Sequence, residues 1–174
     1  FMGYGEEEQD ITGIFEHSEE ASVKVTDIPE TAPDLDKVRK SRKDQSACFF
    51  GPNVIAMCRM ADIVFMALHG SNGEDGKCQA AFDLHGIKYT GDGSVASALA
   101  MDKSITKQIF MAQNVSTPKG IWIKKGESTN LSDYGMKIPV VVKASNGGSS
   151  VGVVIVKDEK DYDAALKECF ALED

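Results

Sequence analysis

The sequence of 174 residues has few cysteines, no long apolar run and no excess of basic residues. Its four cysteines lie far apart without a C-x-x-C pair, which excludes the usual zinc spacings and a disulfide framework and favours reduced thiols. No apolar run approaches the roughly 20 residues that span a bilayer, and no signal peptide is recognisable. The net charge of -8 argues against a nucleic-acid surface, because phosphate backbones require clustered Lys and Arg. We therefore expect no membrane and no nucleic-acid partner.

The composition is that of a globular protein, with 42% hydrophobic and 26% charged residues. The length suits one good domain or two small ones. The chain opens with FMGYGEEE and ends with ALED inside a helical pattern, and both ends are typical of the interior of a domain. We therefore expect this sequence to be a fragment.

The middle of the chain alternates between strand and helix patterns. Ile63–Leu68 is an apolar run typical of a strand buried on both faces of a parallel sheet. A helix is predicted over residues 75–85 and a further strand over 87–90, which together predict a βαβ unit. The loop HGSNGEDG, residues 69–76, then lies at the carboxyl edge of the sheet, where open α/β folds bind ligands.

The second half predicts a helical region over residues 94–113, broken near Asp102, and a short strand over 120–124. Strands over residues 138–143 and 151–156 predict a hairpin. A final helix is expected after the capping pattern Asp158-Glu-Lys-Asp. An earlier helix is expected after Pro52, which suits a first helical turn.

Two glycine motifs can be compared with known nucleotide loops. Gly76-Lys77 fails as a P-loop, because Ser71 and Cys78 replace the required glycine and hydroxyl residues. Residues 91–96 match the dinucleotide pattern G-x-G-x-x-[GA], but the acidic residue expected about 20 positions later is missing. The pattern favours a tight turn with positive φ at glycine, followed by a helix capped by Ser94.

The stretch KASNGGSSVGVV, residues 143–154, is a third glycine-rich loop, and strands are predicted on both sides of it. A helix N-terminus is therefore not available there for binding phosphate. Backbone N–H groups and serine hydroxyls at a hairpin tip can instead close over phosphates, with Lys143 as a point charge. A phosphate-binding flap and a mobile surface hairpin both remain possible from these residues alone.

Four linked blocks follow one another in the chain: ALHG-x-x-GEDG, YTG-x-G, SALAMDK and VVVK-x-x-x-x-GSSVGV. In this order, from about Ala61 to Lys157, they closely resemble the D-alanine–D-alanine ligases of the ATP-grasp superfamily. Each block alone is weak evidence, whereas the four together are specific. Residues 1–60 are less diagnostic and are compatible with the variable part of that family's N-terminal domain.

The resemblance implies an α/β fold. A parallel-sheet, Rossmann-like N-terminal domain, missing its first strand and loop, would cover residues 1–101, and the first part of an α+β ATP-grasp domain would cover residues 102–174. It also implies that ATP phosphorylates the carboxylate of one D-alanine, and that the amine of a second D-alanine then displaces phosphate. The product is a cell-wall peptidoglycan precursor. Phosphoryl transfer depends mainly on positioning and on neutralising charge on oxygens, which two lysines and a glycine-serine flap can provide.

The resemblance also assigns site residues. His69, Glu74 and Ser149 are the expected catalytic residues, the first two at the substrate edge of the first domain. Lys103 and Lys143 resemble the two nucleotide-phosphate lysines. The flap that binds ATP would consist of Gly147, Gly148, Ser149, Ser150 and Gly152. Each of three residues also has a simpler structural role. Lys103 could be a solvated lysine on a helix, His69 could cap the end of a strand, and the Glu74 carboxylate could stabilise the N-terminus of the following helix.

Several parts of the family pattern are missing from this sequence. The family's upstream glutamate loop is absent, and so are the downstream adenine pocket, arginine and magnesium ligands. The fragment is therefore expected to be inactive alone, with no metal ligands of its own for Mg²⁺ (or Mn²⁺). The resemblance further implies a cytoplasmic homodimer with ATP and D-alanine as substrates. The alternatives are a D-alanine–D-lactate or D-alanine–D-serine ligase, and an oxidoreductase that binds a dinucleotide through Gly91-Asp92-Gly93.

Overall fold

The computed structural model describes residues 10–16, 34–43, 45–146, 148 and 152–172. The chain divides into two compact units, one containing residues 1–64 and 85–88 and the other containing residues 65–84 and 89–174. Within the described ranges, no helix is long and apolar enough to cross a membrane.

Among its described residues, the first unit contains two short helices. α1 (Leu35–Ser41) begins after Asp34, whose side chain accepts a hydrogen bond from an amide of the first turn. α2 (Val54–Met60) begins just after Pro52 and confirms the helix predicted there. Val54, the first residue of α2, is buried at 8% exposure.

The strand predicted over residues 63–68 is not formed as a ladder in the structure. Val64 donates one backbone hydrogen bond to the Lys88 carbonyl at 2.8 Å, and no further backbone pairing of this segment occurs among the described residues. Ile63 and Phe65, expected to be buried, are 56% and 78% exposed. A strand requires neighbours that pair its N–H and C=O groups and cover its faces. The parallel sheet expected for the N-terminal domain is therefore not confirmed.

Three helices of the second unit follow one another. α3 (Lys77–Leu84) buries Phe82 completely, and α4 (Ser94–Met101) contacts both α3 and α5 (Lys103–Ala112). The predicted break at Asp102 is confirmed, because its backbone is extended, with φ -84° and ψ 105°. Ser94 is the first helical residue and not the cap, which is Gly93 without a capping side chain. The prediction that Ser94 caps this helix was wrong.

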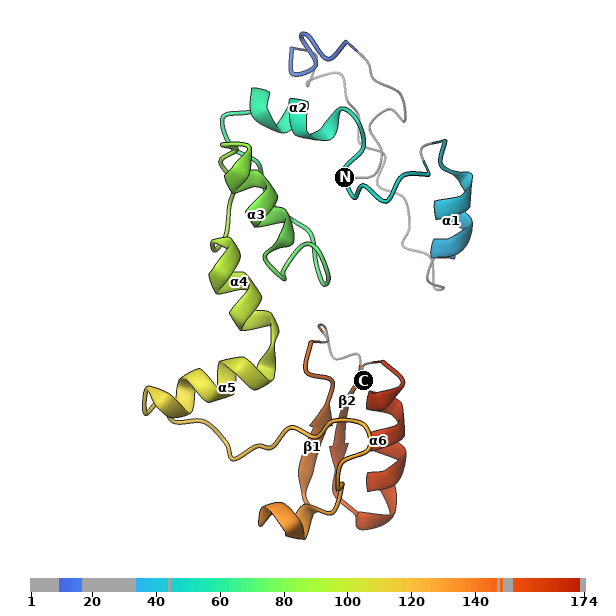
Figure 1. Ribbon diagram of the computed structural model, residues 1–174, viewed down its shortest axis with the longest axis vertical. Helices are drawn as coiled ribbons and strands as arrows, with labels where there is room; N and C mark the ends of the chain where they lie inside the picture. The colour runs from blue at the N-terminus through green and yellow to red at the C-terminus, as the bar shows by residue number, and fades with distance from the viewer. Residues whose placement is uncertain (1–9, 17–33, 44, 147, 149–151, 173–174) are drawn as a thin grey trace. The chain divides into compact units, whose positions relative to one another are not determined.

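The predicted hairpin is confirmed, with β1 (Val140–Lys143) and β2 (Val153–Val156) paired antiparallel. The register places Val140 opposite Val156 and Lys143 opposite Val153. Figure 1 shows the two strands side by side, with α6 (Tyr162–Phe170) lying along them. The strand predicted over residues 120–124 is not formed, since this segment has no ladder partner among the described residues.

The hairpin and α6 share a small apolar core. Ala165 and Cys169, one helical turn apart, are 2% and 7% exposed, and Val156 of β2 is fully buried. The Asp158 side chain accepts from the Lys160 amide at 3.2 Å, ahead of the 3-10 turn Glu159–Asp161 that leads into α6. The helix predicted after this capping pattern is confirmed.

Candidate functional site

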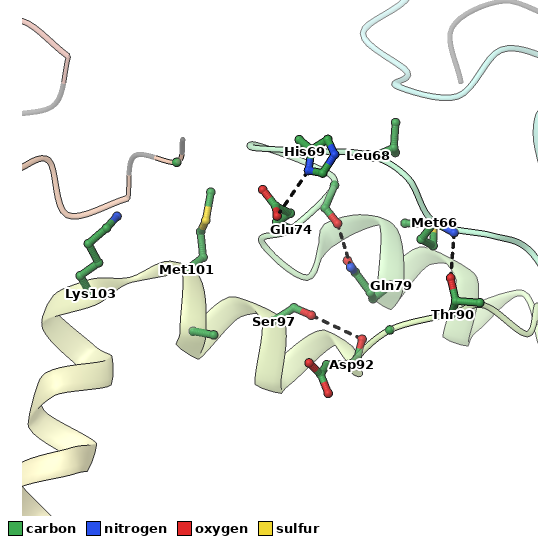
Figure 2. A pocket seen from close by; sticks show the side chains of 14 residues that line it. Met66, Leu68, His69, Glu74, Gln79, Thr90, Asp92, Ser97, Met101 and Lys103 are labelled. Carbon is green, nitrogen blue, oxygen red and sulfur yellow. Dashed lines mark hydrogen bonds and ion pairs between the residues drawn. The ribbon is translucent and has the colours of Figure 1, made fainter. Parts of the chain in front are cut away.

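A pocket of about 550 Å³ opens within the second unit. Figure 2 shows that its side chains come from Met66, Leu68 and the loop that follows, from Gln79 of α3, from Thr90–Asp92, from α4 and from the start of α5. Four predicted site residues line it: His69, Glu74, Lys103 and Gly148. The other lining residues are Met66, Leu68, Gly73, Gln79, Thr90, Gly91, Asp92, Ser97, Ala100 and Met101.

Glu74 closes the loop that follows Leu68. Its Oε2 accepts a hydrogen bond from the Gly70 N–H at 2.6 Å, and its own N–H donates to the Gly70 carbonyl at 2.9 Å. Its Oε1 lies 3.7 Å from Nδ1 of His69 (Figure 2). The two side chains are 49% and 83% exposed, so this pair contributes less than about 1 kcal/mol to stability. The loop therefore presents a carboxylate and an imidazole together at the pocket edge.

The shape of this loop depends on two residues that the sequence did not single out. A side chain at Gly73 would not fit, because its Cβ would lie 2.5 Å from Cβ of Leu68. The buried Gln79 of α3 donates from Nε2 to the Gly73 carbonyl at 2.8 Å. Its Oε1 is also buried and accepts no hydrogen bond from the described residues. A glycine and a buried amide thus hold the loop against α3.

Lys103 is the first residue of α5 and lies at the other end of the pocket (Figure 2). Its backbone N–H and its Nζ both donate to the carbonyl of Ser145, at 3.1 and 3.0 Å. The Ser145 hydroxyl donates to Oδ1 of Asp102 at 3.2 Å. The junction between α4 and α5 is therefore tied to the segment that follows β1.

Asp102 caps α5. Its Oδ1 accepts from the amides of Ser104 and Ile105 at 2.8 and 3.0 Å, and from the Ser104 hydroxyl at 2.6 Å. The hydrogen bond from the Ser104 hydroxyl, followed by that from the Ile105 amide, lowers the pKa of Asp102 below its usual value; partial burial opposes the shift, and the Ser145 hydroxyl adds to it. The carboxylate is consequently charged at neutral pH.

The remaining predicted site residues lie elsewhere or outside the described residues. Lys143 is exposed at the end of β1 and does not line the pocket. Gly152, also outside the lining, is buried with φ 65°, and its carbonyl accepts from the Ala144 N–H at 3.1 Å and from the Cys169 thiol at 3.3 Å. Gly147, Ser149 and Ser150 lie outside the described residues, so their roles stay predictions.

The structure also shows which groups can contact a ligand or metal. In the part of the chain that the structure describes, no group of three or more His, Cys, Asp or Glu side chains could hold a metal ion. Thr90 and Ser97 line the pocket and hold its walls: the Thr90 hydroxyl accepts from the Met66 N–H at 2.9 Å, and Ser97 donates to the Asp92 carbonyl at 3.4 Å. Both residues lie inside motif blocks, but a threonine and a serine are too common for their residue types alone to predict a place in the site.

A pocket that brings together a carboxylate, an imidazole and a lysine ammonium group is typical of an enzyme site. Two family models match the chain: the D-ala D-ala ligase N-terminus over residues 7–92 and the D-ala D-ala ligase C-terminus over residues 109–174. The chain belongs to the D-alanine–D-alanine ligase family.

Known relatives show the extent of the similarity. The D-alanine–D-alanine ligase of Lacticaseibacillus casei is 37% identical over 171 residues, which cover 98% of this chain and 47% of that protein. The ligase of Bacillus anthracis complexed with ATP is 34% identical with a TM-score of 0.59, covering 69% of this chain and 40% of that one. The VanG D-Ala:D-Ser ligase of Enterococcus faecalis is 33% identical with a TM-score of 0.55, covering 64% and 33%. The chain spans about half the length of the curated relatives it matches.

Proposed function

We propose that this chain forms the substrate side and part of the ATP-binding side of a D-alanine–D-alanine ligase for peptidoglycan synthesis. The observation that carries the proposal is the pocket that combines Lys103 with His69 and Glu74. An ammonium group binds phosphate oxygens as a point charge, and a carboxylate with an imidazole suits the charged groups of an amino acid. The complex of the Bacillus anthracis relative with ATP supports ATP as the nucleotide.

The start of α5 indicates how phosphate would be bound. The amide of Lys103 donates to Ser145, those of Ser104 and Ile105 donate to Asp102 Oδ1, and that of Thr106 donates to the Asp102 carbonyl. The first four N–H groups of α5, from Lys103 to Thr106, therefore already have acceptors, the last of them in the ordinary intrahelical bond. Phosphate binding at this end of the pocket would depend on the Lys103 ammonium group itself.

The other predicted site residues would serve the two steps of the ligase reaction, phosphoryl transfer and peptide-bond formation. The phosphoryl group moves from ATP to a carboxylate oxygen of the first D-alanine, and the amine of the second displaces phosphate as the peptide bond forms. Lys143 would provide a second positive charge for the phosphates, and Ser149 with the glycines of the flap would cover them. None of these side chains needs to become covalently modified.

Further properties belong to the proposal. Mg²⁺ (or Mn²⁺) would be held by ligands elsewhere in the enzyme, because the described residues provide no cluster for it. The expected parallel-sheet domain would end at about residue 101, and the two family models leave residues 93–108 between them. The enzyme would be a cytoplasmic homodimer, as the family resemblance implies.

A second candidate substrate has specific support. The similarity to the VanG D-Ala:D-Ser ligase supports D-serine as an alternative second substrate. A D-alanine–D-lactate ligase fits the same motifs. The family assignment favours all three over an oxidoreductase that binds through Gly91-Asp92-Gly93.

The proposal can be tested by isothermal titration calorimetry of the chain with ATP in the presence of Mg²⁺. A hydrogen bond to a charged group contributes about 1.5–3 kcal/mol, so Lys103→Ala should weaken ATP binding by about 10- to 100-fold. Lys157→Ala removes an exposed lysine outside the pocket and should leave the Kd unchanged. The same Kd for Lys103→Ala as for the unmodified chain, or equal losses in both variants, would contradict the proposal.

A further inference from the structure

We propose that Ser145 and Asp102 are positioning residues that hold the Lys103 ammonium group at the pocket. The link of this arrangement to ATP rests on the proposed function, whereas the positioning itself can be measured without a nucleotide. Neither Ser145 nor Asp102 lines the pocket, so both would act through Lys103.

The Ser145 carbonyl is an acceptor that helps to fix where the lysine side chain lies. The Ser145 oxygen accepts from Nζ of Lys103 at 3.0 Å and from the backbone N–H of the same residue at 3.1 Å. The side chain is therefore bound to the same atom as its own backbone. Because a carbonyl is neutral, it orients the ammonium group without cancelling the positive charge that a phosphate would require.

The carbonyl is itself held from two sides. The Ser145 hydroxyl donates to Oδ1 of Asp102 at 3.2 Å, which connects segments 43 positions apart in the chain. The preceding residue, Ala144, is 7% exposed and donates its N–H to the Gly152 carbonyl at 3.1 Å. Ser145 is thus attached both to the hairpin base and to the cap of α5.

Asp102 is suited to this role because α5 already fixes its carboxylate. The amides of Ser104 and Ile105 and the Ser104 hydroxyl all donate to the Oδ1 atom that also accepts from Ser145. Hydrogen bonds connect Asp102 to Ser145 and Ser145 to Lys103, and the chain connects Lys103 to Asp102. Loss of the Ser145 hydroxyl would open this ring while keeping the carbonyl.

Three serine variants separate the effect of the Ser145 hydroxyl on Lys103 from the general effect of removing a serine hydroxyl. Ser145→Ala removes the hydrogen bond to Asp102, and Ser145→Thr keeps a hydroxyl. The matched control is Ser128→Ala, because Ser128 donates to Oδ2 of Asp133 at 2.6 Å in an exposed loop that does not line the pocket. Asp102→Asn gives an intermediate case, because asparagine caps a helix as well as aspartate but is a neutral acceptor.

The first readout is the rate at which an amine-selective reagent acetylates Lys103, followed by mass spectrometry and normalised to Lys157. A net contribution of about 0.5–1.5 kcal/mol for one hydrogen bond corresponds to a 2- to 12-fold rise in this rate for Ser145→Ala. Ser145→Thr and Ser128→Ala should react like the unmodified chain, and Asp102→Asn should react at an intermediate rate. An unchanged Lys103 rate in Ser145→Ala would overturn the inference.

The second readout is the Kd for ATP in a double-mutant cycle. Ser145→Ala should weaken ATP binding 2- to 12-fold when Lys103 is present and cause no further loss in the Lys103→Ala background. Equal losses in both backgrounds would show that Ser145 acts independently of Lys103 and would overturn the inference. A raised acetylation rate in a chain whose ATP affinity does not depend on Lys103 would support the positioning and contradict the proposed function.

Discussion

Among the glycines that the structure describes, Gly76 is the one where an added Cβ would lie closest to another atom. Its φ is 87°, in the left-handed region, and a Cβ built there would lie 2.3 Å from the backbone carbonyl oxygen of Ser94. That oxygen belongs to the first residue of α4, so it cannot rotate away as a flexible side chain would. Gly76→Ala would therefore push α4, which lines the pocket, away from the loop that precedes α3.

The loss of folding free energy expected for Gly76→Ala has two parts. A left-handed backbone costs a residue with Cβ about 1–2 kcal/mol, and overpacking against a fixed group adds about 1–3 kcal/mol. Gly76→Ala should therefore lower the free energy of unfolding by about 2–5 kcal/mol. Gly86 provides a matched control, because its φ is 65° and a Cβ there would meet nothing within 4 Å. Gly86→Ala should cost only the backbone part, about 1–2 kcal/mol.

Urea unfolding followed by circular dichroism, with fitted midpoints and slopes, would measure both variants. The difference between them isolates the contact with the Ser94 carbonyl, and we expect it to be about 1–3 kcal/mol. Equal destabilisation of the two variants would show that the close approach of Gly76 to α4 does not exist in solution. That result would also refute the packing of α3 against α4 on which the pocket wall depends.

Two further predictions concern the hairpin and the cap of α5. Val156 is fully buried, whereas its neighbour Ile155 is 67% exposed. In urea unfolding, Val156→Ala should therefore destabilise the chain by about 2 kcal/mol and Ile155→Ala by less than about 0.5 kcal/mol. Equal effects of the two substitutions would contradict the register. The folded pKa of Asp102 is lowered, so its contribution is present above the unfolded pKa of about 3.9 and is lost as pH falls through the folded pKa. The unfolding midpoint should therefore fall less below about pH 4 in Asp102→Asn than in the unmodified chain, and identical pH profiles would contradict this linkage.

Local chemistry predicted the hairpin and the helices from α2 to α6, whereas α1 was not predicted. The helix break at Asp102, the helix after Asp158 and the hairpin around the glycine-serine loop all depend on residues close together in the chain. Caps, turn residues and alternating apolar residues act over a few positions, so one sequence is sufficient to recognise them.

The strands predicted over residues 63–68, 87–90 and 120–124 were not found, for a physical reason. An apolar run indicates that a segment can be buried, but a strand exists only where another segment pairs with its backbone. Val64 has one such hydrogen bond, to Lys88, and Phe65 is 78% exposed. Partner availability is a property of the folded chain that the run of residues does not contain.

The candidate site was recognised in part. His69, Glu74 and Lys103 were selected from motif blocks, and the structure brings them to one pocket with Gly148. Gln79 and Ser145 were not selected, because an amide and a serine are common residues and their partners lie 6 and 43 positions away. Only the fold shows that one supports the Glu74 loop and the other holds Lys103.

By itself, the sequence determined the family and the order of the motif blocks, and it predicted which residue types would bind phosphate and an amino acid. Those features depend on covalent order and on the intrinsic chemistry of each side chain. The tertiary structure decided that Lys103 donates to the Ser145 carbonyl, that Lys143 lies outside the pocket, and that Gly76 must lack a side chain. These outcomes depend on distances between segments far apart in the chain, which packing alone establishes.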